Sequence, residues 1–182
     1  MALINEFRKQ GDFLFKNRSY FPLLIIVVAI IVDAYIYYYH LSNPYGPTEN
    51  YYQFIAVVLC LFGLFIRIFT VGFSPDGTSG RNTKEGQVAS VLNTTGAYSM
   101  LRHPLYLGNF FMWFGVAFWV KDFWFIIAFI FLYTLYYERI MYAEEAFLIQ
   151  KFNNQYTAWS SKTQQSFPLL KITKDRIIHF PF

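Results

Sequence analysis

Four long apolar runs dominate the pattern of hydrophobic and polar positions along this chain. They cover residues 22–40, 52–71, 105–119 and 123–142, and charged side chains are rare within them. A helix that crosses a membrane needs about 20 mostly apolar residues, which the first, second and fourth runs provide. The third run gives only about 23 Å of helix, so it begins earlier, near Arg102, or crosses the bilayer incompletely. We therefore predict an all-α, polytopic membrane protein with four transmembrane helices, of which the last two form a hairpin.

Polar segments separate and follow these runs. Residues 72–95 are rich in Gly, Ser, Thr and Asn and are expected to form a loop, with a short helix over 84–92. Beyond the fourth run, apolar residues recur at helical spacing through residues 143–159. This pattern predicts an amphipathic tail on the inner membrane surface, and a solvent-covered terminal helix is the alternative. The closing residues 167–182 would extend the same tail.

Lysine and arginine are distributed asymmetrically around the four runs. The loop over residues 41–51 contains neither, and the turn between the third and fourth runs contains only Lys121. The other side carries Arg8, Lys9, Lys16, Arg18, Arg81, Lys84, Arg102, Lys151, Lys162, Lys171, Lys174 and Arg176. Because cytoplasmic loops are enriched in Lys and Arg, we expect both termini to be cytoplasmic. The net charge of +4 then reflects orientation and attraction to anionic membrane lipids, and no nucleic-acid partner is expected.

Composition narrows the class of protein further. Of the 182 residues, 55% are hydrophobic and only 14% are charged, whereas a disordered chain needs high charge and few aromatics. The single Cys60 has no partner for a disulfide scaffold. The length fits one domain, residues 1–182, with the N-terminal spans in residues 1–71. The small size and the absence of a C-terminal retrieval motif lead us to expect a bacterial plasma membrane.

Two charged residues lie within the first two runs. Asp33 is in the middle of the first, and ionisable residues inside a membrane are functional candidates. Its alternative is a neutral carboxyl group that is hydrogen-bonded to nearby tyrosines. Arg67 would lie roughly 10 Å closer to the inner end than Asp33, which is too far for direct contact. We expect Arg67 to reach toward the inner headgroups instead.

The sequence GAYSMLRHPLYLG, residues 96–108, is the most informative stretch. Pro104 suits the first turn of a helix, where its missing N–H is not needed. Arg102 and His103 then lie at a helix N-terminus, whose free N–H groups and positive dipole favour an anionic ligand group. Tyr106 would add a hydroxyl group close by. Anchoring at the membrane interface is the alternative role for the arginine and the histidine.

An acidic pair, Glu144 and Glu145, follows the fourth run. Counted from the turn between the third and fourth runs, the pair lies roughly 9–10 Å beyond the depth of Pro104. Adjacent helical residues diverge by about 100°, so we expect the two carboxylates not to face the same ligand. One would then be available to a bound molecule while the other pairs with Arg102 or His103.

These motifs resemble the integral-membrane methyltransferases of the isoprenylcysteine carboxyl methyltransferase and phospholipid N-methyltransferase group. The pattern of that group is Arg-His-Pro-x-Tyr, an apolar residue and Gly, followed further on by a Glu-Glu pair. Here the first element is RHPLYLG and the second is Glu144-Glu145, within a resemblance that covers residues 87–170. The resemblance implies methyl transfer from S-adenosylmethionine to a lipophilic acceptor, with residues 72–182 as the cofactor-binding region.

The resemblance also implies roles for individual residues. Those implied to hold the cofactor are Leu92, Tyr98, His103, Pro104, Leu105, Tyr106 and Glu144. Arg102, at the same helix start, is expected to join them. An arginine shortly before the acidic pair contacts the methyl acceptor in this group, and its nearest equivalent here is Arg139. Glu145 is implied as a supporting residue.

The methyl acceptor stays open at this point. Methyl transfer from a sulfonium mainly requires alignment of the acceptor with a donor that is already activated. A carboxylate acceptor, such as a prenylated one, needs no general base. An amine must lose a proton, for which Glu145 or a tyrosine is a candidate. No metal ion is expected.

Two other functions are consistent with parts of this sequence. Membrane sterol and steroid reductases carry a similar Arg-His-Pro-x-Tyr stretch and use NADPH. This chain is short, however, and lacks a comparable acidic-basic cluster after its last run. A non-catalytic membrane adaptor is the third alternative and would need no cofactor pocket. Binding of S-adenosylmethionine but not of NADPH would separate the three.

Overall fold

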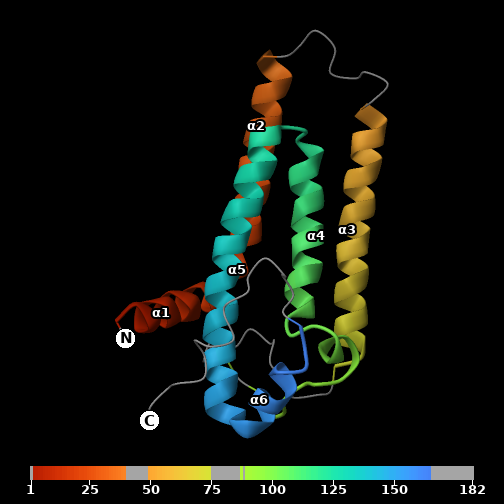
Figure 1. Cartoon of the computed structure of the whole chain (residues 1–182). Coiled ribbons are helices and arrows are strands. Elements are labelled where there is room, and N and C mark those ends of the chain that lie inside the picture. The colour runs from red at the N-terminus through yellow and green to blue at the C-terminus, as the bar shows by residue number, and fades with distance from the viewer. Residues whose placement is uncertain (1, 40–48, 75–86, 88, 165–182) are drawn as a thin grey trace.

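The computed structural model describes residues 2–39, 49–74, 87 and 89–164. The helices within them are α1 (Ala2–Lys16), α2 (Tyr20–Tyr39), α3 (Glu49–Gly72), the 3₁₀-helix η1 (Gly96–Ser99), α4 (Pro104–Trp119), α5 (Phe123–Phe152) and α6 (Asn154–Ser160). Figure 1 shows α2, α3, α4 and α5 side by side, with α1 and α6 at one end of the bundle. We call this end the α6 end.

Three of the described helices are long and apolar enough to cross a membrane. They are Tyr20–Tyr39, Asn50–Gly72 and Phe123–Phe152. Large apolar side chains such as Ile31 and Phe65 are more than half exposed on these helices, as expected of surfaces that contact lipid. The prediction of an all-helical membrane protein is confirmed. The third predicted span forms α4, whose 16 residues correspond to about 24 Å.

Local sequence signals set the boundaries of the α4–α5 hairpin. Pro104 lies in the first turn of α4, and His103 is the residue that precedes the helix. Asp122 caps α5, since its carboxylate accepts a hydrogen bond from the backbone N–H of Phe125 at 2.6 Å. Between the two helices, Lys121 adopts a positive φ of 58°, which reverses the chain in a short turn.

Helices α3 and α4 approach each other closely through glycines. A Cβ atom on Gly63 would lie 2.5 Å from the backbone carbonyl oxygen of Gly108 and 2.5 Å from the backbone nitrogen of Met112. A Cβ atom on Gly115 would lie 2.6 Å from the carbonyl oxygen of Ala56. Small residues stabilise helix pairs in membranes because they let the two backbones meet. Gly108 therefore serves the contact with α3.

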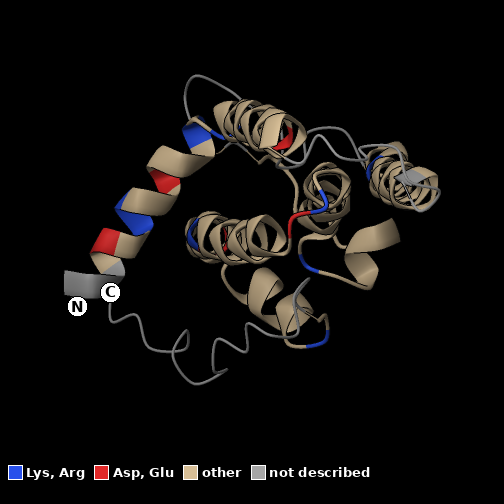
Figure 2. Cartoon of the chain, turned by 90° about the horizontal axis from the view of Figure 1, so that it is seen from above, with Lys and Arg blue, Asp and Glu red and all other residues tan. Residues whose placement is uncertain are grey.

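Aromatic rings fill the space between α4 and α5. Phe110 lies 5.3 Å from Tyr133 and 6.2 Å from Phe129, measured between ring centroids. Phe114 adds a further contact with Phe129 at 6.3 Å. Figures 1 and 2 show α4 between α3 and α5. One side of α4 packs on α3 through glycines, and the other packs on α5 through aromatic rings. These contacts fix the position of the first turn of α4.

Helix α1 was not among the predicted elements. It lies across α5 at the α6 end (Figure 1), with Gly11 against the backbone of Arg139 and with Arg8 donating a hydrogen bond to Gln150 at 2.9 Å. Its signal was present in the sequence, because Phe7, Gly11 and Phe15 recur at helical spacing.

The region after the fourth run differs from the predicted continuous tail. Helix α5 continues to Phe152, and the chain then turns at Asn153, whose φ is 42°. Helix α6 follows and folds back at the α6 end (Figure 1), so the predicted helix over 143–159 is broken in two. Residues 89–92 are not helical, in contrast to the predicted helix over 84–92. Residue 87 is not helical either, and residues 84–86, 88 and 165–182 lie outside the described residues.

Candidate functional site

An imidazole ring between two carboxylates forms the centre of the candidate site. His103, at the start of α4, places Nδ1 3.5 Å from Oε2 of Glu144 and Nε2 3.1 Å from Oε1 of Glu145. The three residues are buried, with His103 and Glu145 each 5% exposed. Tyr106, one turn into α4, donates a hydrogen bond from its hydroxyl group to Oε2 of Glu144 at 2.8 Å. We call these four residues the imidazole–carboxylate cluster.

The carboxylates control the protonation of the imidazole. Burial alone would lower the pKa of His103, but the hydrogen bonds and charges of Glu144 and Glu145 outweigh it and raise this pKa to about 9. His103 is therefore cationic at neutral pH and cannot act as a general base there. Its charge is shared by two carboxylates, so it neutralises neither of them alone.

The acidic pair reaches the start of α4 across the offset in depth that residue counting predicts. Glu144 contacts Tyr106 in the first turn, and both carboxylates contact His103 just before it. Side chains lean toward the N-terminus of their own helix, and α4 and α5 run in opposite directions. Tyr106 therefore leans toward the α6 end while the carboxylates lean away from it, which closes the offset. Glu145 pairs with Arg102 and His103, as predicted for one of the two carboxylates, and the expectation that the two do not face the same ligand stays a prediction.

Arg102 connects the cluster to the chain that follows α6. Its guanidinium donates hydrogen bonds to the carbonyl oxygens of Ser160 at 2.6 Å and Thr163 at 3.1 Å, and one nitrogen lies 3.5 Å from Oε1 of Glu145. Its backbone N–H donates to the carbonyl of Gln164 at 2.9 Å. Arg102 therefore fastens residues 160–164 beside the cluster, as a clasp rather than as an open anion site.

Helices η1 and α6 close the same side of the cluster. The indole N–H of Trp159 donates a hydrogen bond to the carbonyl oxygen of Tyr98 at 3.1 Å. Burial and the charge of nearby Glu144 raise the pKa of the Tyr98 hydroxyl above its usual range. The chain enters η1 through Gly96, whose φ of 56° favours glycine. The Tyr98 hydroxyl group is thus within the electrostatic range of Glu144.

A small apolar core lies next to the cluster, and unpaired polar atoms occur in it at Tyr156 and, two residues before Ala89 in the chain, at Gln87. Ala89, Leu148 and Tyr156 form this core, with Leu92 packed against it. Tyr156 lies near Glu145, but its buried hydroxyl group makes no hydrogen bond of normal geometry. Both polar side-chain atoms of Gln87 are likewise buried without a hydrogen-bond partner. Unpaired buried polar atoms are rare and call for an explanation, such as a polar ligand.

Sequence reasoning did not assign Gln87 or Tyr156 to the site. Gln87 had no signal, because an isolated Gln in a polar loop has no pattern that distinguishes it. Tyr156 had a weak one, since it lies 11 residues after Glu145, or about three helical turns. We had interpreted it as part of an amphipathic tail.

The remaining predicted residues differ in how close they lie to the cluster. Pro104 is fully buried, and Leu105 is half-buried beside it in the first turn of α4. Arg139 lies apart, with its guanidinium 3.6 Å above the ring of Phe7 in α1 and 3.8 Å from Glu138. The structure therefore does not bring Arg139 to the imidazole–carboxylate cluster.

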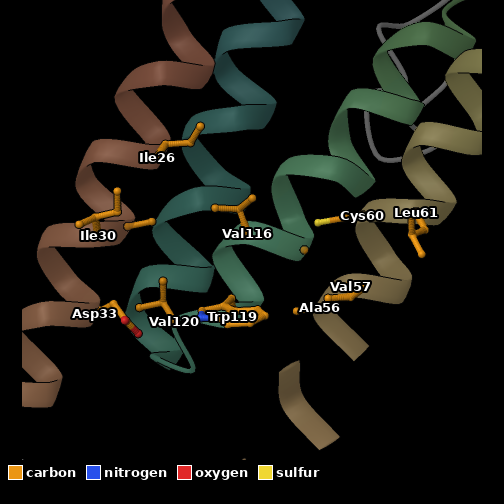
Figure 3. Close-up of a pocket in the computed structure, with 12 residues that line it drawn as sticks. Ile26, Ile30, Asp33, Ala56, Val57, Cys60, Leu61, Val116, Trp119 and Val120 are labelled. Carbon is orange, nitrogen blue, oxygen red and sulfur yellow. The ribbon is translucent and has the colours of Figure 1, made fainter. Parts of the chain in front are cut away.

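Asp33 and Arg67 lie in different environments. Arg67 donates a hydrogen bond to Asn109 inside the bundle, so the prediction that it reaches to the headgroups was wrong. Asp33 lines an apolar cavity of about 350 Å³ between α2, α3 and α4, near Trp119 at the far end of α4 (Figure 3). Among the described residues, no tyrosine is hydrogen-bonded to Asp33. This cavity is separate from the imidazole–carboxylate cluster.

Comparison with known families gives a match over this region. The model of the family described as phospholipid methyltransferase (PEMT) matches residues 51–155. The match covers more than half of the chain. It includes all of α4 and α5, nearly all of α3, and the whole imidazole–carboxylate cluster. No curated protein matches the chain.

Proposed function

The chain belongs to the phospholipid methyltransferase family and is a membrane methyltransferase, and from this premise we propose that it methylates a nitrogen of a phospholipid headgroup with S-adenosylmethionine as donor. The observation that carries the proposal is the buried imidazole between Glu144 and Glu145 at the shared end of α4 and α5. Two carboxylates buried at a membrane surface are costly to maintain, and such groups concentrate at functional sites.

The residues around the cluster fit S-adenosylmethionine. Glu145 contacts Arg102 and His103, and Glu144 contacts His103 and accepts a hydrogen bond from Tyr106. The carboxylate of Glu144 is the group that would attract a sulfonium or ammonium ion. The unpaired amide of Gln87 and hydroxyl of Tyr156 supply donors and acceptors for a polar ring such as adenine. When bound, the cofactor supplies a methyl group that its positive sulfur has already activated.

We assign the cofactor-binding role to His103, Tyr106 and Glu144, supported by Tyr98 and by the backbone around Pro104 and Leu105. Leu92 would add apolar contact from the neighbouring core. Glu145 orients the imidazole ring, and Arg102 acts as the clasp that closes the site. Arg139, which the sequence pattern matched to an acceptor-binding arginine, keeps this role only if α1 shifts away from it.

A nitrogen acceptor must release a proton, and the cluster can accept one. The cationic His103 is not available for this task at neutral pH, so the carboxylates are the bases at hand. Glu144 receives a hydrogen bond from Tyr106, which holds one of its oxygens in place. The same carboxylate would attract the headgroup amine. A prenylated carboxylate acceptor would need neither a base nor a negative partner for an amine.

For the topology, we propose four membrane crossings, with α4 as the short fourth one. Most of the described basic residues lie at the α6 end, on α1, in the connection after α1, beside η1 and on the residues that flank α6, whereas Lys121 lies at the opposite turn. This asymmetry supports a cytoplasmic α6 end and cytoplasmic termini in a bacterial plasma membrane. The site would then lie where a soluble cofactor meets a lipid from the inner leaflet.

The test is transfer of labelled methyl groups into extracted lipid. Purified protein is mixed with labelled S-adenosylmethionine and vesicles that contain phosphatidylethanolamine, and separately with a prenylated cysteine peptide. We expect label in the phospholipid and a decrease of at least about 100-fold for Glu144→Gln, because an electrostatic partner of the reacting groups is removed. Glu138→Gln, on the same helix, serves as the matched control and should retain activity.

Three outcomes would contradict the proposal. Label in the peptide but not in phospholipid would exclude the nitrogen acceptor. Equal binding of S-adenosylmethionine by wild type and Glu144→Gln in calorimetry, together with equal transfer, would exclude the assigned site. Binding of NADPH in place of S-adenosylmethionine would point to a reductase.

A further inference from the structure

Two arginines at the α6 end of the bundle stack on phenylalanine rings of α1. The guanidinium carbon of Arg18 lies 4.1 Å from the ring centroid of Phe15, and that of Arg139 lies 3.6 Å from the centroid of Phe7. Both are cation–π interactions. The residues around the two guanidinium groups differ.

Arg139 is on the side of α5 that faces α1. The backbone carbonyl of Arg139 lies directly against Gly11 of α1, where a Cβ atom would clash. Five residues separate Arg139 from Glu144, which places the two side chains about 140° apart around the helix. A ligand group on Arg139 would therefore lie on the other side of α5 from the imidazole–carboxylate cluster.

Arg18 is in the short connection between α1 and α2. Its stacking partner Phe15 is only 2% exposed and belongs to the same apolar core as Tyr106 and Tyr137. Phe21, three residues after Arg18, stacks on Tyr136 with ring centroids 3.9 Å apart. The aromatic contacts on both sides of Arg18 therefore hold this connection beside the core that includes Tyr106 of the cluster.

The charge of Arg18 supports this placement, because it extends to the carboxylate of Glu144. The connection between α1 and α2 is also where an interfacial helix meets a membrane span, which is the depth of lipid phosphates.

This inference rests on the proposed function and specifies its acceptor site. We propose that Arg18 binds the phosphate of a glycerophospholipid whose headgroup amine lies beside Glu144. An arginine fork matches two phosphate oxygens, and charge-assisted contacts of this kind are strong. Phosphate and amine of an ethanolamine headgroup are separated by two carbons, so a zwitterion of this size matches neighbouring positive and negative groups. Arg18 is then a specificity-determining residue for lipids that carry both charges.

The experiment compares Arg18→Gln with wild type in the labelled transfer assay, with phosphatidylethanolamine diluted into neutral detergent micelles. Loss of one charge-assisted contact should raise KM for the phospholipid about 10-fold or more, while the affinity for S-adenosylmethionine measured by calorimetry stays unchanged. Arg18→Lys should give an intermediate KM, because it keeps the charge but loses the fork. Arg8→Gln, which removes a positive charge from the exposed part of α1, is the matched control and should behave as wild type.

Other results have distinct meanings. An unchanged phospholipid KM in both Arg18 variants would overturn the inference while leaving the proposed function intact. A raised KM in Arg139→Gln with no change in Arg18→Gln would assign the acceptor to the other side of α5. No transfer from wild type to any phospholipid would overturn the proposed function itself. If Arg18→Gln fails to fold, the KM of Arg18→Lys decides between these results.

Discussion

Helix α4 meets its two neighbours through different kinds of contact. Toward α3, Gly63 and Gly115 leave so little space that backbone atoms touch across the contact. Toward α5, aromatic rings fill the membrane part, and buried charges lie at the α6 end. The first contact is dominated by close packing, with one hydrogen bond from Arg67 to Asn109 beside it. The second contains groups that packing does not require, and they are the ones we assign to chemistry.

Helix α4 is thus held in position by its contact with α3, while the side that faces α5 carries the residues assigned to the reaction. The α3 contact sets the position and tilt of α4 mainly through close backbone packing, to which Arg67 adds a hydrogen bond with Asn109. The first turn of α4 can therefore hold His103 and Tyr106 in place against Glu144. A site built on rigid helices needs less support from the loops around it. Mutations on the two sides should then have separable effects on stability and on activity.

The largest expected effect follows from removal of the imidazole. His103→Ala leaves Glu144 and Glu145 buried without the cation between them, and breaking a buried ion pair in this way costs about 3–5 kcal/mol. Unfolding in detergent with a graded denaturant measures the loss. Addition of Glu145→Gln to the variant should recover part of it, because one uncompensated charge is removed. If the double variant is no more stable than the single one, the charges are not the source of the effect.

A change of pH should produce a smaller version of this effect. The pKa of His103 is about 9 in the folded protein and about 6.5 in an ordinary unfolded chain. The stability that comes from the imidazolium charge is therefore complete below about pH 6.5 and is lost as the pH rises through about 9. We expect the melting temperature of wild type to fall between pH 7 and 10. The fall should be absent from His103→Ala, and parallel curves for the two proteins would contradict our assignment of the charge.

The smallest predicted effect concerns the glycine side of α4. Gly63→Ala places a Cβ atom against backbone atoms of Gly108 and Met112, and overpacking of this kind costs about 1–3 kcal/mol. Activity per folded molecule should stay within about twofold of wild type, because α5 and the cluster are not touched. Gly72→Ala is the matched control, since nothing lies within 4 Å of a Cβ atom there. A large loss of activity at full stability would show that the two sides of α4 are coupled.

Much of the fold could be predicted from the sequence because its signals are local. Apolar runs of spanning length marked α2, α3 and α5, and Pro104 and Asp122 marked the starts of α4 and α5. The pattern around His103 and Glu144 also indicated a family, which the match over residues 51–155 confirms. The same helical periodicity is present in α1, where basic residues lie between the apolar ones.

The candidate site could be predicted only in part. Its composition was visible as an Arg-His-Pro-x-Tyr stretch and an acidic pair, but the contacts between them were not. Residue counting put the carboxylates too far from α4, because it ignored the opposite lean of side chains on antiparallel helices. It also gave Arg139 and Arg18 no relative placement, since which side of α5 faces α1 depends on packing. Gln87 had no sequence signal at all.

The sequence by itself determined the helices, their ends and the residue types that could bind a charged ligand, because helix propensity, capping and hydrophobic length act over a few residues. Only the tertiary structure decided that His103 lies between Glu144 and Glu145, that Arg102 fastens the segment after α6, and that Arg139 packs against α1 away from the cluster. These relations depend on how far two helices are rotated and tilted against each other. Contacts distant in the sequence set that rotation, and glycines and aromatic rings on α4 are the ones that do so here.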